Sequence, residues 1–352
     1  MTRAPTTARS LADLVEAGTL PRTALADPAL AQVALDYAIA VTPDVLDLIE
    51  GTPADDPIAR QFIPTAQEAT TTPEERDDPI GDHAYAPVKG IVHRYPDRVL
   101  LKPLHTCPVY CRFCFRREQV GPGGAALNEA EFEAALAYIA ARPQIWEVII
   151  TGGDPFMLSP RRIARIVEAL DAIAHVAVIR FHTRVPVVDP ARVDTAVVDA
   201  LKARRAAVYV GVHCNHAREL TPAARACLAR LADAGIVLLS QSVLLRGVND
   251  SVEALEALFR ALVAARVRPY YLHHPDLARG TSHFRLPIDE GQALMRALRG
   301  RLSGLCQPTY VLDIPGGHGK SPIGPSYVSD ADSDGRRAVT DFRGERHDYP
   351  DG

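Results

Sequence analysis

The segment VLLKPLHTCPVYCRFC, which runs from Val99 to Cys114, decides the fold. Its first half, residues 99–105, is a largely apolar run that predicts a buried strand, and three cysteines follow it closely. Similar runs recur downstream, with amphipathic helical stretches between them. They are WEVII (146–150), AVIRFHT (177–183), AVYVGVH (207–213), IVLLSQSVL (236–244) and PYYLHH (269–274). Strands that alternate with helices in this way predict consecutive βα units and a parallel sheet.

The predicted fold class is α/β, and the strands start 29 to 47 residues apart. Periodicity of this kind fits a partial (β/α)6 barrel and also an open, doubly wound sheet. The chemically active residues described below follow the carboxyl ends of successive strands, where barrel enzymes build their sites. The sequence therefore favours the partial barrel. One more apolar run, PTYVLDIP (308–315), follows the last helix and leads into a Gly-rich segment.

The chain has 352 residues, of which 47% are hydrophobic and 23% are charged, and its formal net charge is −4. This length suits one large barrel with attachments, or about two domains. The composition argues against intrinsic disorder and against a polybasic surface for nucleic acid. No apolar run reaches the roughly 18 to 20 residues that a bilayer span needs, and the first residues lack the apolar core of a secretory signal. We therefore expect a cytoplasmic protein without a membrane or nucleic-acid partner.

Residues 1–95 are predicted to form an N-terminal helical region and connector. Thr42 and Pro43 place an N-cap before a proline at the first helical position. Residues 55–87 are rich in Pro, Thr and Asp and predict an extended segment with little regular structure. We expect the partial barrel to cover residues 96–304 and a separate C-terminal segment to cover residues 305–352.

Three cysteines, Cys107, Cys111 and Cys114, form a C-x3-C-x2-C motif on one short loop. Three thiolates can hold three irons of a [4Fe-4S] cluster and leave the fourth iron open to a chelating ligand, whereas closed clusters use four cysteines. The alternative is a zinc site, which normally takes four ligands in paired knuckles. The chain's other cysteines are scattered, at Cys214, Cys227 and Cys306. The motif therefore favours the cluster.

The cysteine motif, with the aromatic Phe113 just before its third cysteine, resembles that of the radical S-adenosylmethionine enzymes. The resemblance implies that the open iron binds the amino and carboxylate groups of S-adenosylmethionine, whose reductive cleavage yields a 5′-deoxyadenosyl radical. It also implies an electron donor such as flavodoxin or ferredoxin. A second match is the TGGDP turn after the strand at 146–150. Its residues Gly152, Gly153 and Asp154 correspond to the glycine-rich turn that receives the methionine amino group.

Over residues 80–348 the chain resembles the lysine 2,3-aminomutase family in particular. The matching segments are HRYPDRVLL, CPVYCRFCFRR, TGGDP, QSVLLRGVND, YYLHHPDL and DIPGGHGKSP. The resemblance implies an isomerase that interconverts L-α-lysine and β-lysine by radical amino migration, with pyridoxal 5′-phosphate (PLP) as a further cofactor. It assigns the covalent attachment of PLP to Lys320. The glycines around Lys320 agree, because they predict a flexible loop whose backbone can approach the cofactor ring.

The same resemblance assigns three arginines. Arg94 and Arg98 match residues that bind the PLP phosphate. Arg116 matches the arginine that forks onto the substrate carboxylate, a bidentate task that suits a guanidinium group. Spacing alone would leave each of them as an ordinary surface residue in a chain with 35 arginines.

Substrate choice is assigned by resemblance to Asp276 and Asp313, which match the two carboxylates that hold the ε-ammonium of lysine. Two carboxylates suit a buried ammonium, whereas a glutamate substrate would need cations or amides there. The alternative interpretations are a helix N-cap for Asp276 and a turn former for Asp313. Neither aspartate is expected to contact a cofactor group. His213 and Gln241 match contacts to S-adenosylmethionine, although histidines at a strand end more often serve packing.

Long members of the family carry a structural zinc between subunits, bound by a cysteine after the GVND segment and by a C-terminal cysteine cluster. Here Ser251 follows GVND and no cysteine follows Cys306, so zinc is not expected. Without that zinc site, the sequence does not decide whether the protein forms a homo-oligomer. Three functional alternatives also stay open: the same chemistry supplying β-lysine for modification of elongation factor P, an aminomutase for another amino acid, and a non-catalytic iron–sulfur sensor.

Overall fold

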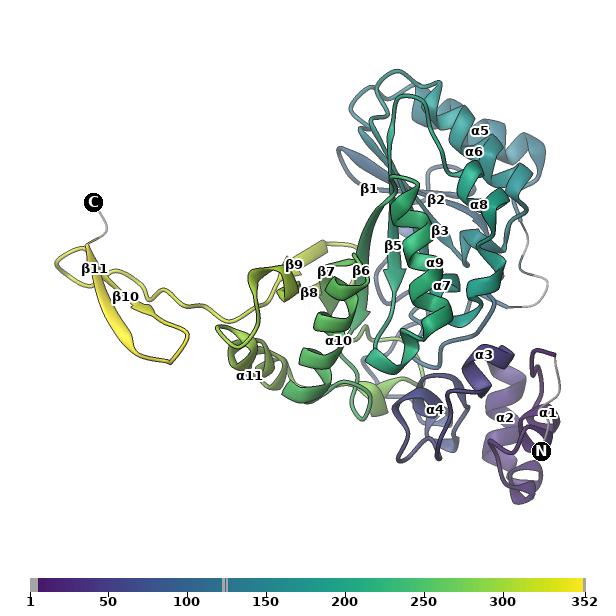
Figure 1. The fold of residues 1–352 in the computed structure, drawn as a ribbon, viewed down its shortest axis with the longest axis horizontal. Helices are drawn as coiled ribbons and strands as arrows, with labels where there is room; N and C mark the ends of the chain where they lie inside the picture. The colour runs from purple at the N-terminus through teal and green to yellow at the C-terminus, as the bar shows by residue number, and fades with distance from the viewer. Residues whose placement is uncertain (1–5, 122–123, 125, 351–352) are drawn as a thin grey trace.

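The computed structural model describes residues 6–121, 124 and 126–350. Its main sheet is built from β1 (Ile91–Tyr95), β2 (Arg98–Leu104), β3 (Glu147–Gly152), β4 (Val178–Thr183), β5 (Ala207–His213), β6 (Val237–Val243), β7 (Arg268–His273), β8 (Thr309–Ile314) and β9 (Gly319–Pro322). These strands lie side by side in chain order (Figure 1). Strands β2 to β8 are parallel, and β1 and β9 are antiparallel additions at the edges. A doubly wound sheet reverses its strand order at a switch point, so the unbroken order confirms the partial barrel.

Helices connect successive strands and cover the outside of the sheet (Figure 1). They are α5 (Glu129–Ala140), α6 (Pro160–Asp171), α7 (Val185–Val188), α8 (Thr195–Ala200), α9 (Pro222–Asp233), α10 (Val252–Ala264) and α11 (Ile288–Leu298). A capping box begins α5, because Asn128 and Glu131 each accept the other's backbone N–H. Ser251, which directly follows the GVND segment, caps α10.

Alternation along the strands separates an apolar face from a polar one. On β2, Leu101 is buried in the core that the helices cover, whereas Arg98 and Leu100 line a central cavity. Side chains on a strand point to opposite faces in turn, so each parallel strand contributes every second residue to that cavity. The hydrophobic core therefore lies between sheet and helices, and the inner face of the sheet carries the chemistry.

The first and last strands of the sheet approach each other and nearly close the barrel. The backbone N–H of Lys320 on β9 donates to the Oη of Tyr95 on β1 at 2.6 Å. Beside this bond, a Cβ atom placed on Gly81 would lie 2.5 Å from the backbone nitrogen of Gly317. Strands β1 and β9 are therefore joined by side-chain and loop contacts, and not by backbone hydrogen bonds between paired strands.

Two residues expected on irregular backbone lie on strands instead. Lys320 was expected in a flexible loop, and one interpretation made Asp313 a turn former, but they face each other in register on β9 and β8. The tight turn at residues 315–318 explains this, because it returns the chain antiparallel to β8. Gly316 and Gly317 supply the positive φ angles that the turn requires.

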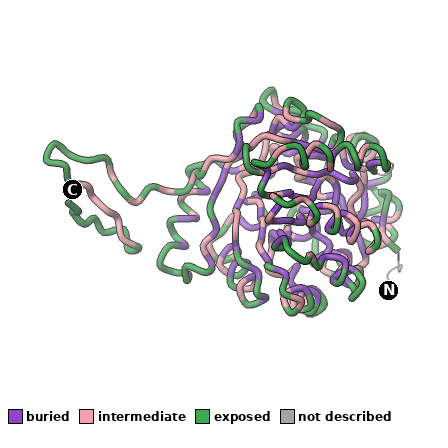
Figure 2. The backbone as a smooth tube through the Cα atoms, turned by 90° about the horizontal axis from the view of Figure 1, so that it is seen from above, coloured by how far each residue is buried: buried purple, intermediate pink, exposed green. Residues whose placement is uncertain are grey.

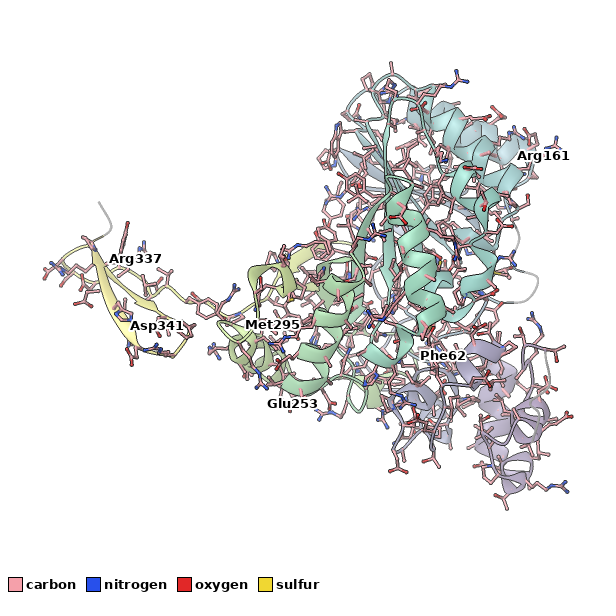
Figure 3. All side chains as sticks on the ribbon, viewed as in Figure 1. Phe62, Arg161, Glu253, Met295, Arg337 and Asp341 are labelled. Atoms are coloured by element: carbon pink, nitrogen blue, oxygen red, sulfur yellow. The ribbon has the colours of Figure 1, made fainter. Side chains whose placement is uncertain are left out.

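The N-terminal region contains α1 (Leu11–Glu16), α2 (Pro28–Asp36), α3 (Pro43–Leu46) and α4 (Pro57–Phe62). It packs against the barrel, and Phe62 is almost fully buried there (Figures 1 and 3). Two backbone bonds tie it to the cysteine loop: Tyr110 N–H donates to Ala40 at 3.1 Å, and Arg112 N–H donates to Gln61 at 2.8 Å. The N-terminal region therefore supports the loop from outside the barrel.

A buried carboxylate strengthens this support. Glu68 accepts hydrogen bonds from the guanidinium groups of Arg112 and Arg117, which flank the third cysteine of the loop. Burial acts to raise the pKa of Glu68, but the charges of the two arginines outweigh it and hold that pKa below its usual range. One ionised glutamate thus fixes two arginines of the cysteine loop.

The C-terminal hairpin, β10 (Arg336–Thr340) and β11 (Arg346–Pro350), projects from the body of the molecule (Figures 1 and 2). Arg337 and Asp341 lie on it (Figure 3). Every residue of β11 is exposed. Within the described part of the chain, no helix is long and apolar enough to span a bilayer.

Candidate active site

One cavity of about 520 Å³ occupies the inside of the barrel. Every residue that the sequence assigned to the site lines it, with the exception of Gly152. A volume of this size is typical of pockets that enclose a small-molecule ligand. Residues from the cysteine loop, the strand ends and β9 therefore meet in one place, as their positions at the carboxyl ends of the strands predict.

The three motif cysteines line the cavity, and each is partly exposed to it. Burial raises the pKa of all three thiols, and that of Cys114 reaches about 11. The charges of neighbouring cysteines raise the pKa of Cys107 and Cys114 further. Three thiolates so close together in a dry site need a cationic group to stabilise them.

The spacing of the sulfur atoms distinguishes a cluster from a single metal ion. Within the described residues, only Asp341, Glu345 and His347 of the exposed hairpin place three metal-ligating atoms within 4.8 Å of one another. At least one pair of the three cysteine sulfurs is therefore more than 4.8 Å apart. Two sulfurs on one zinc ion can be at most about 4.6 Å apart, because each Zn–S bond is about 2.3 Å. A cluster spreads its cysteines over separate irons, so this spacing suits a cluster better than three thiolates on one zinc ion.

The TGGDP turn packs directly on the cysteine loop. A Cβ atom on Gly153 would lie 2.5 Å from the carbonyl oxygen of Thr106, so only glycine fits there. The carboxylate of Asp154 is fully engaged, since it accepts bonds from the backbone of Phe156 and Arg184 and from the hydroxyl of Thr183. Asp154 thus joins the ends of β3 and β4, and its assigned contact to S-adenosylmethionine stays a prediction.

His213 and Gln241 are neighbours in register on β5 and β6. The imidazole of His213 stacks on Phe113 of the cysteine loop, with ring centroids 5.6 Å apart. Its Nε2 has no hydrogen-bond partner among the described residues, although the atom is buried. An unpaired buried nitrogen at the wall of a cavity is suited to receive a polar ligand group.

Lys320 and Asp313 form an ion pair inside the cavity, with Nζ 2.6 and 2.8 Å from the two carboxylate oxygens. His273 contributes Nδ1 at 3.4 Å from Asp313. Burial acts to raise the pKa of Asp313, but His273 and Lys320 outweigh it and hold the pKa below its usual range. Asp313 therefore contacts the lysine to which PLP is assigned, and the expectation that neither aspartate contacts a cofactor group stays a prediction.

Asp276 is the second carboxylate at this end of the cavity. Its Oδ1 is buried and has no hydrogen-bond partner in the described part of the structure. Burial and the nearby charge of Asp313 raise the pKa of Asp276 to about 8. The irregular segment after β7 holds it, so it is not the helix N-cap of the alternative interpretation. A buried, unpaired carboxyl beside an ionised one is half of a receptor for a cation.

The three predicted arginines also line the cavity, and Asp82 contacts two of them. Asp82 accepts from Arg94 at 3.0 Å and from Nη2 of Arg116 at 3.0 Å. The amine of Lys102 lies 3.9 Å from the same carboxylate. Arg98 instead stacks on Tyr95, with its guanidinium carbon 3.7 Å from the ring centroid. The single negative charge of Asp82 faces three cations, Arg94, Arg116 and Lys102. This group of side chains therefore has a net positive charge, which suits an anionic ligand.

Several polar residues of the cavity were not singled out from the sequence. Arg180 and Glu147 form an ion pair at 3.0 Å near the amino-terminal ends of their strands, and the hydroxyls of Tyr270 and Tyr271 are 3.0 Å apart beside them. All four line the cavity. For Arg180 and Glu147, a charged residue within a predicted apolar strand was the sequence signal that could have identified them. Asp82 had no such signal, because it belongs to the connector that lacks periodicity.

Comparison with known proteins agrees with this geometry. Residues 101–259 match the Radical SAM superfamily, and residues 295–351 match the family described as Lysine-2,3-aminomutase. The L-lysine 2,3-aminomutase of Clostridium subterminale is 40% identical over 309 residues, which cover 88% of this chain and 74% of that protein. The chain belongs to the lysine 2,3-aminomutase family. The L-lysine 2,3-aminomutase of Fusobacterium nucleatum is 42% identical over 290 residues, which cover 82% of this chain and 68% of the relative.

Other relatives are named for a different amino acid. The glutamate 2,3-aminomutase of Clostridioides difficile is 34% identical over 297 residues, which cover 84% of this chain and 70% of that protein. Among solved structures, a radical SAM methyltransferase from Sphaerobacter thermophilus matches with a TM-score of 0.44 and 21% identity over 63% of this chain and 68% of that chain.

Membership of the lysine 2,3-aminomutase family makes the protein an enzyme of the aminomutase kind, whose general reaction is an isomerisation. The radical SAM superfamily implies a [4Fe-4S] cluster and S-adenosylmethionine. The choice of substrate depends on the side chains of the cavity.

Proposed function

We propose that the protein is a lysine 2,3-aminomutase that uses PLP on Lys320 and converts L-α-lysine to β-lysine. The observation that carries the proposal is the pair of buried carboxylates, Asp276 and Asp313, in the same cavity as Lys320 and Arg116. A substrate with a distal ammonium matches two carboxylates, whereas a distal carboxylate would be repelled by them. The relative named for glutamate makes this distinction necessary.

The cavity residues divide the work of binding. When bound, the cluster and S-adenosylmethionine supply a 5′-deoxyadenosyl radical, and PLP supplies a ring that stabilises a substrate radical. Arg116 offers a guanidinium fork to the substrate α-carboxylate. Arg98 and Arg94 are the candidates for the PLP phosphate, although Asp82 and the carbonyl oxygen of Ile80 engage Arg94 in this structure.

Asp313 has a place for an ammonium group, and Lys320 fills that place here. When the Lys320 amine is engaged elsewhere, the place becomes free for the ε-ammonium of a lysine substrate. Asp313 and the Oδ1 of Asp276 are buried, and this reduced contact with water strengthens the attraction of the carboxylates for a cation. The geometry thus favours a lysine substrate, whose ε-ammonium can take the position on Asp313 that the Lys320 amine occupies here.

The direct test is product analysis after anaerobic reconstitution with iron, sulfide and PLP. With S-adenosylmethionine, a low-potential reductant and L-lysine, we expect β-lysine to form. Parallel incubations with L-glutamate should give no β-amino acid. Turnover of glutamate in preference to lysine would contradict the substrate assignment and leave the aminomutase chemistry in place.

Replacing Asp276 with asparagine should lower kcat/KM for lysine about 10- to 150-fold. One charge-assisted hydrogen bond is worth roughly 1.5 to 3 kcal/mol, and each 1.4 kcal/mol or so is a factor of ten. Iron and PLP contents should match those of the parent, since the buried Oδ1 of Asp276 has no hydrogen-bond partner among the described residues and the side chain is not part of the cysteine loop. Asp313→Asn should cause a loss of at least this size, because it also frees Lys320. Parent-like kinetics in both variants would remove the basis for choosing lysine.

The pH dependence of kcat/KM should report the ionisation of Asp276. The pKa of this carboxyl is raised to about 8, so it is mostly protonated at neutral pH. Binding of an ammonium group requires the ionised form, so kcat/KM for lysine should rise with pH, by up to about tenfold per unit, and level off near pH 8. Profiles between pH 6 and 9 test this. The Asp276→Asn variant should lack the rise, and a rise that persists in it would assign the ionisation to another group.

A further inference from the structure

Arg184, which directly follows β4, reaches the cysteine loop with a buried guanidinium group. Its Nη1 donates to the Sγ of Cys111 at 2.9 Å. Its Nη2 donates to Gln61 at 2.6 Å and to Glu219 at 2.7 Å. Only 5% of the residue is exposed. The arginine is therefore held by an anion on one side and directs a charged N–H at a cluster ligand on the other.

We propose that Arg184 sets the reduction potential of the cluster bound by the three motif cysteines, and that Glu219 limits its effect. The inference rests on the proposed function, since it requires the cluster. Hydrogen bonds to the cysteine sulfurs and the local net charge are among the factors that tune iron–sulfur potentials. Reduction adds one negative charge to the cluster and its thiolates. A cationic donor on Cys111 stabilises that charge, so it raises the potential.

Glu219 provides the opposing influence. It ends the short helix η6 (Ala217–Glu219), and it is almost fully buried. Its Oε1 accepts the backbone N–H groups of Asn215 and His216, both at 2.9 Å, while its Oε2 pairs with Arg184. The carboxylate is thus fixed independently of the arginine. Its negative charge offsets the charge of Arg184 and lowers the potential relative to an uncompensated arginine.

The geometry of this group is fixed from three distant parts of the chain. Gln61 on α4 accepts from Arg184 and from the Nδ2 of Asn215, and its carbonyl oxygen accepts from the backbone of Arg112. The guanidinium of Arg184 also lies 4.4 Å from the ring centroid of Phe62. In this dry setting, one charge acts more strongly on its neighbours than it would at the surface.

The competing explanation is that Arg184 only braces the loop against β4. Bracing predicts that any change in the group reduces the amount of cluster and leaves the potential of the remaining cluster unaltered. Tuning predicts shifts of opposite sign when the cation and the anion are removed. Arg184 acts through Cys111 and is a positioning residue, so the potential is the readout that separates the two explanations.

The experiment is a redox titration of the reconstituted cluster, followed by electron paramagnetic resonance, without S-adenosylmethionine. Glu219→Gln should favour the reduced cluster about tenfold, which raises the potential by about 59 mV for a one-electron couple. Arg184→Met should lower the potential by at least as much. The double variant should lie between Arg184→Met and the parent, and it avoids leaving a lone buried charge if the single arginine variant folds poorly.

Iron content and lysine turnover of the parent distinguish a failure of the proposed function from a failure of the role of Arg184. A parent that binds no cluster overturns the proposed function and this inference together. A parent with full cluster and β-lysine formation, combined with unchanged potentials in Glu219→Gln and in the double variant, overturns only the role of Arg184. Shifts of the same sign in all variants also contradict it.

Discussion

Replacing Cys111 with serine is expected to abolish both cluster binding and amino migration. The cysteine loop offers three thiols, and losing one leaves two ligands for a cluster that already has an open iron. The other two thiols are buried, and burial raises their pKa, so they do not remain as thiolates without the cations that they bind. No other cysteine lines the cavity among the described residues, so none can substitute.

Iron and sulfide analysis after anaerobic reconstitution measures the effect, with product formation as a second readout. The matched control is Cys227→Ala, because Cys227 is buried on α9 and does not line the cavity. The control should bind about four irons and retain activity. Stoichiometric zinc on the motif cysteines of protein purified without oxygen would contradict the cluster, as would full iron content in Cys111→Ser.

Replacing Lys320 with alanine is expected to remove covalently trapped PLP and to reduce activity below detection. Lys320 is the lysine of the cavity wall, and its Nζ already lies among groups that bind and release a proton. The ion pair with Asp313 holds the amine inside the barrel, so the attachment point is fixed before any cofactor arrives. Without the Lys320 side chain, PLP has no amine to which it can bind covalently, and Asp313 loses its ion-pair partner.

Borohydride reduction of the PLP-loaded parent, followed by peptide mapping, should place the label on Lys320. The chain has three other lysines, and the matched controls are the exposed pair Lys89→Gln and Lys202→Gln. Both controls should keep the visible absorbance of bound PLP. Label on Lys89, Lys102 or Lys202 in the parent would show that the attachment point is wrong.

The sequence predicted the arrangement of the barrel and most of its cavity because both depend on local patterns. Apolar runs place the strands, and the position of a residue at a strand end determines that it faces the cavity mouth. Cys107, Asp154 and Asp276 could be brought together on this ground, whereas Lys320 was assigned by resemblance to the family. The resemblance to the family added the roles that spacing leaves open, above all those of Arg94, Arg98 and Arg116.

What the sequence could not show are contacts between segments that share no pattern. Asp82 lies in a connector without periodicity, yet it holds the substrate-binding candidate Arg116. Gln61 and Glu219 are 158 residues apart, and both bond the same arginine. Strand β9 was missed because its pairing depends on the turn at residues 315–318, whose glycines are equally compatible with a loose loop.

The order of strands in the sheet also governs how the protein can assemble during synthesis. Each strand hydrogen-bonds to the strand made just before it, so the sheet can grow as the chain leaves the ribosome. The residues that surround the cysteine loop, including Gln61, Arg184 and Glu219, have all emerged by the end of η6. The bond between Tyr95 and Lys320 spans 225 residues and must form late. The ligand set of the proposed cluster is therefore complete in the growing chain before Lys320 has been synthesised.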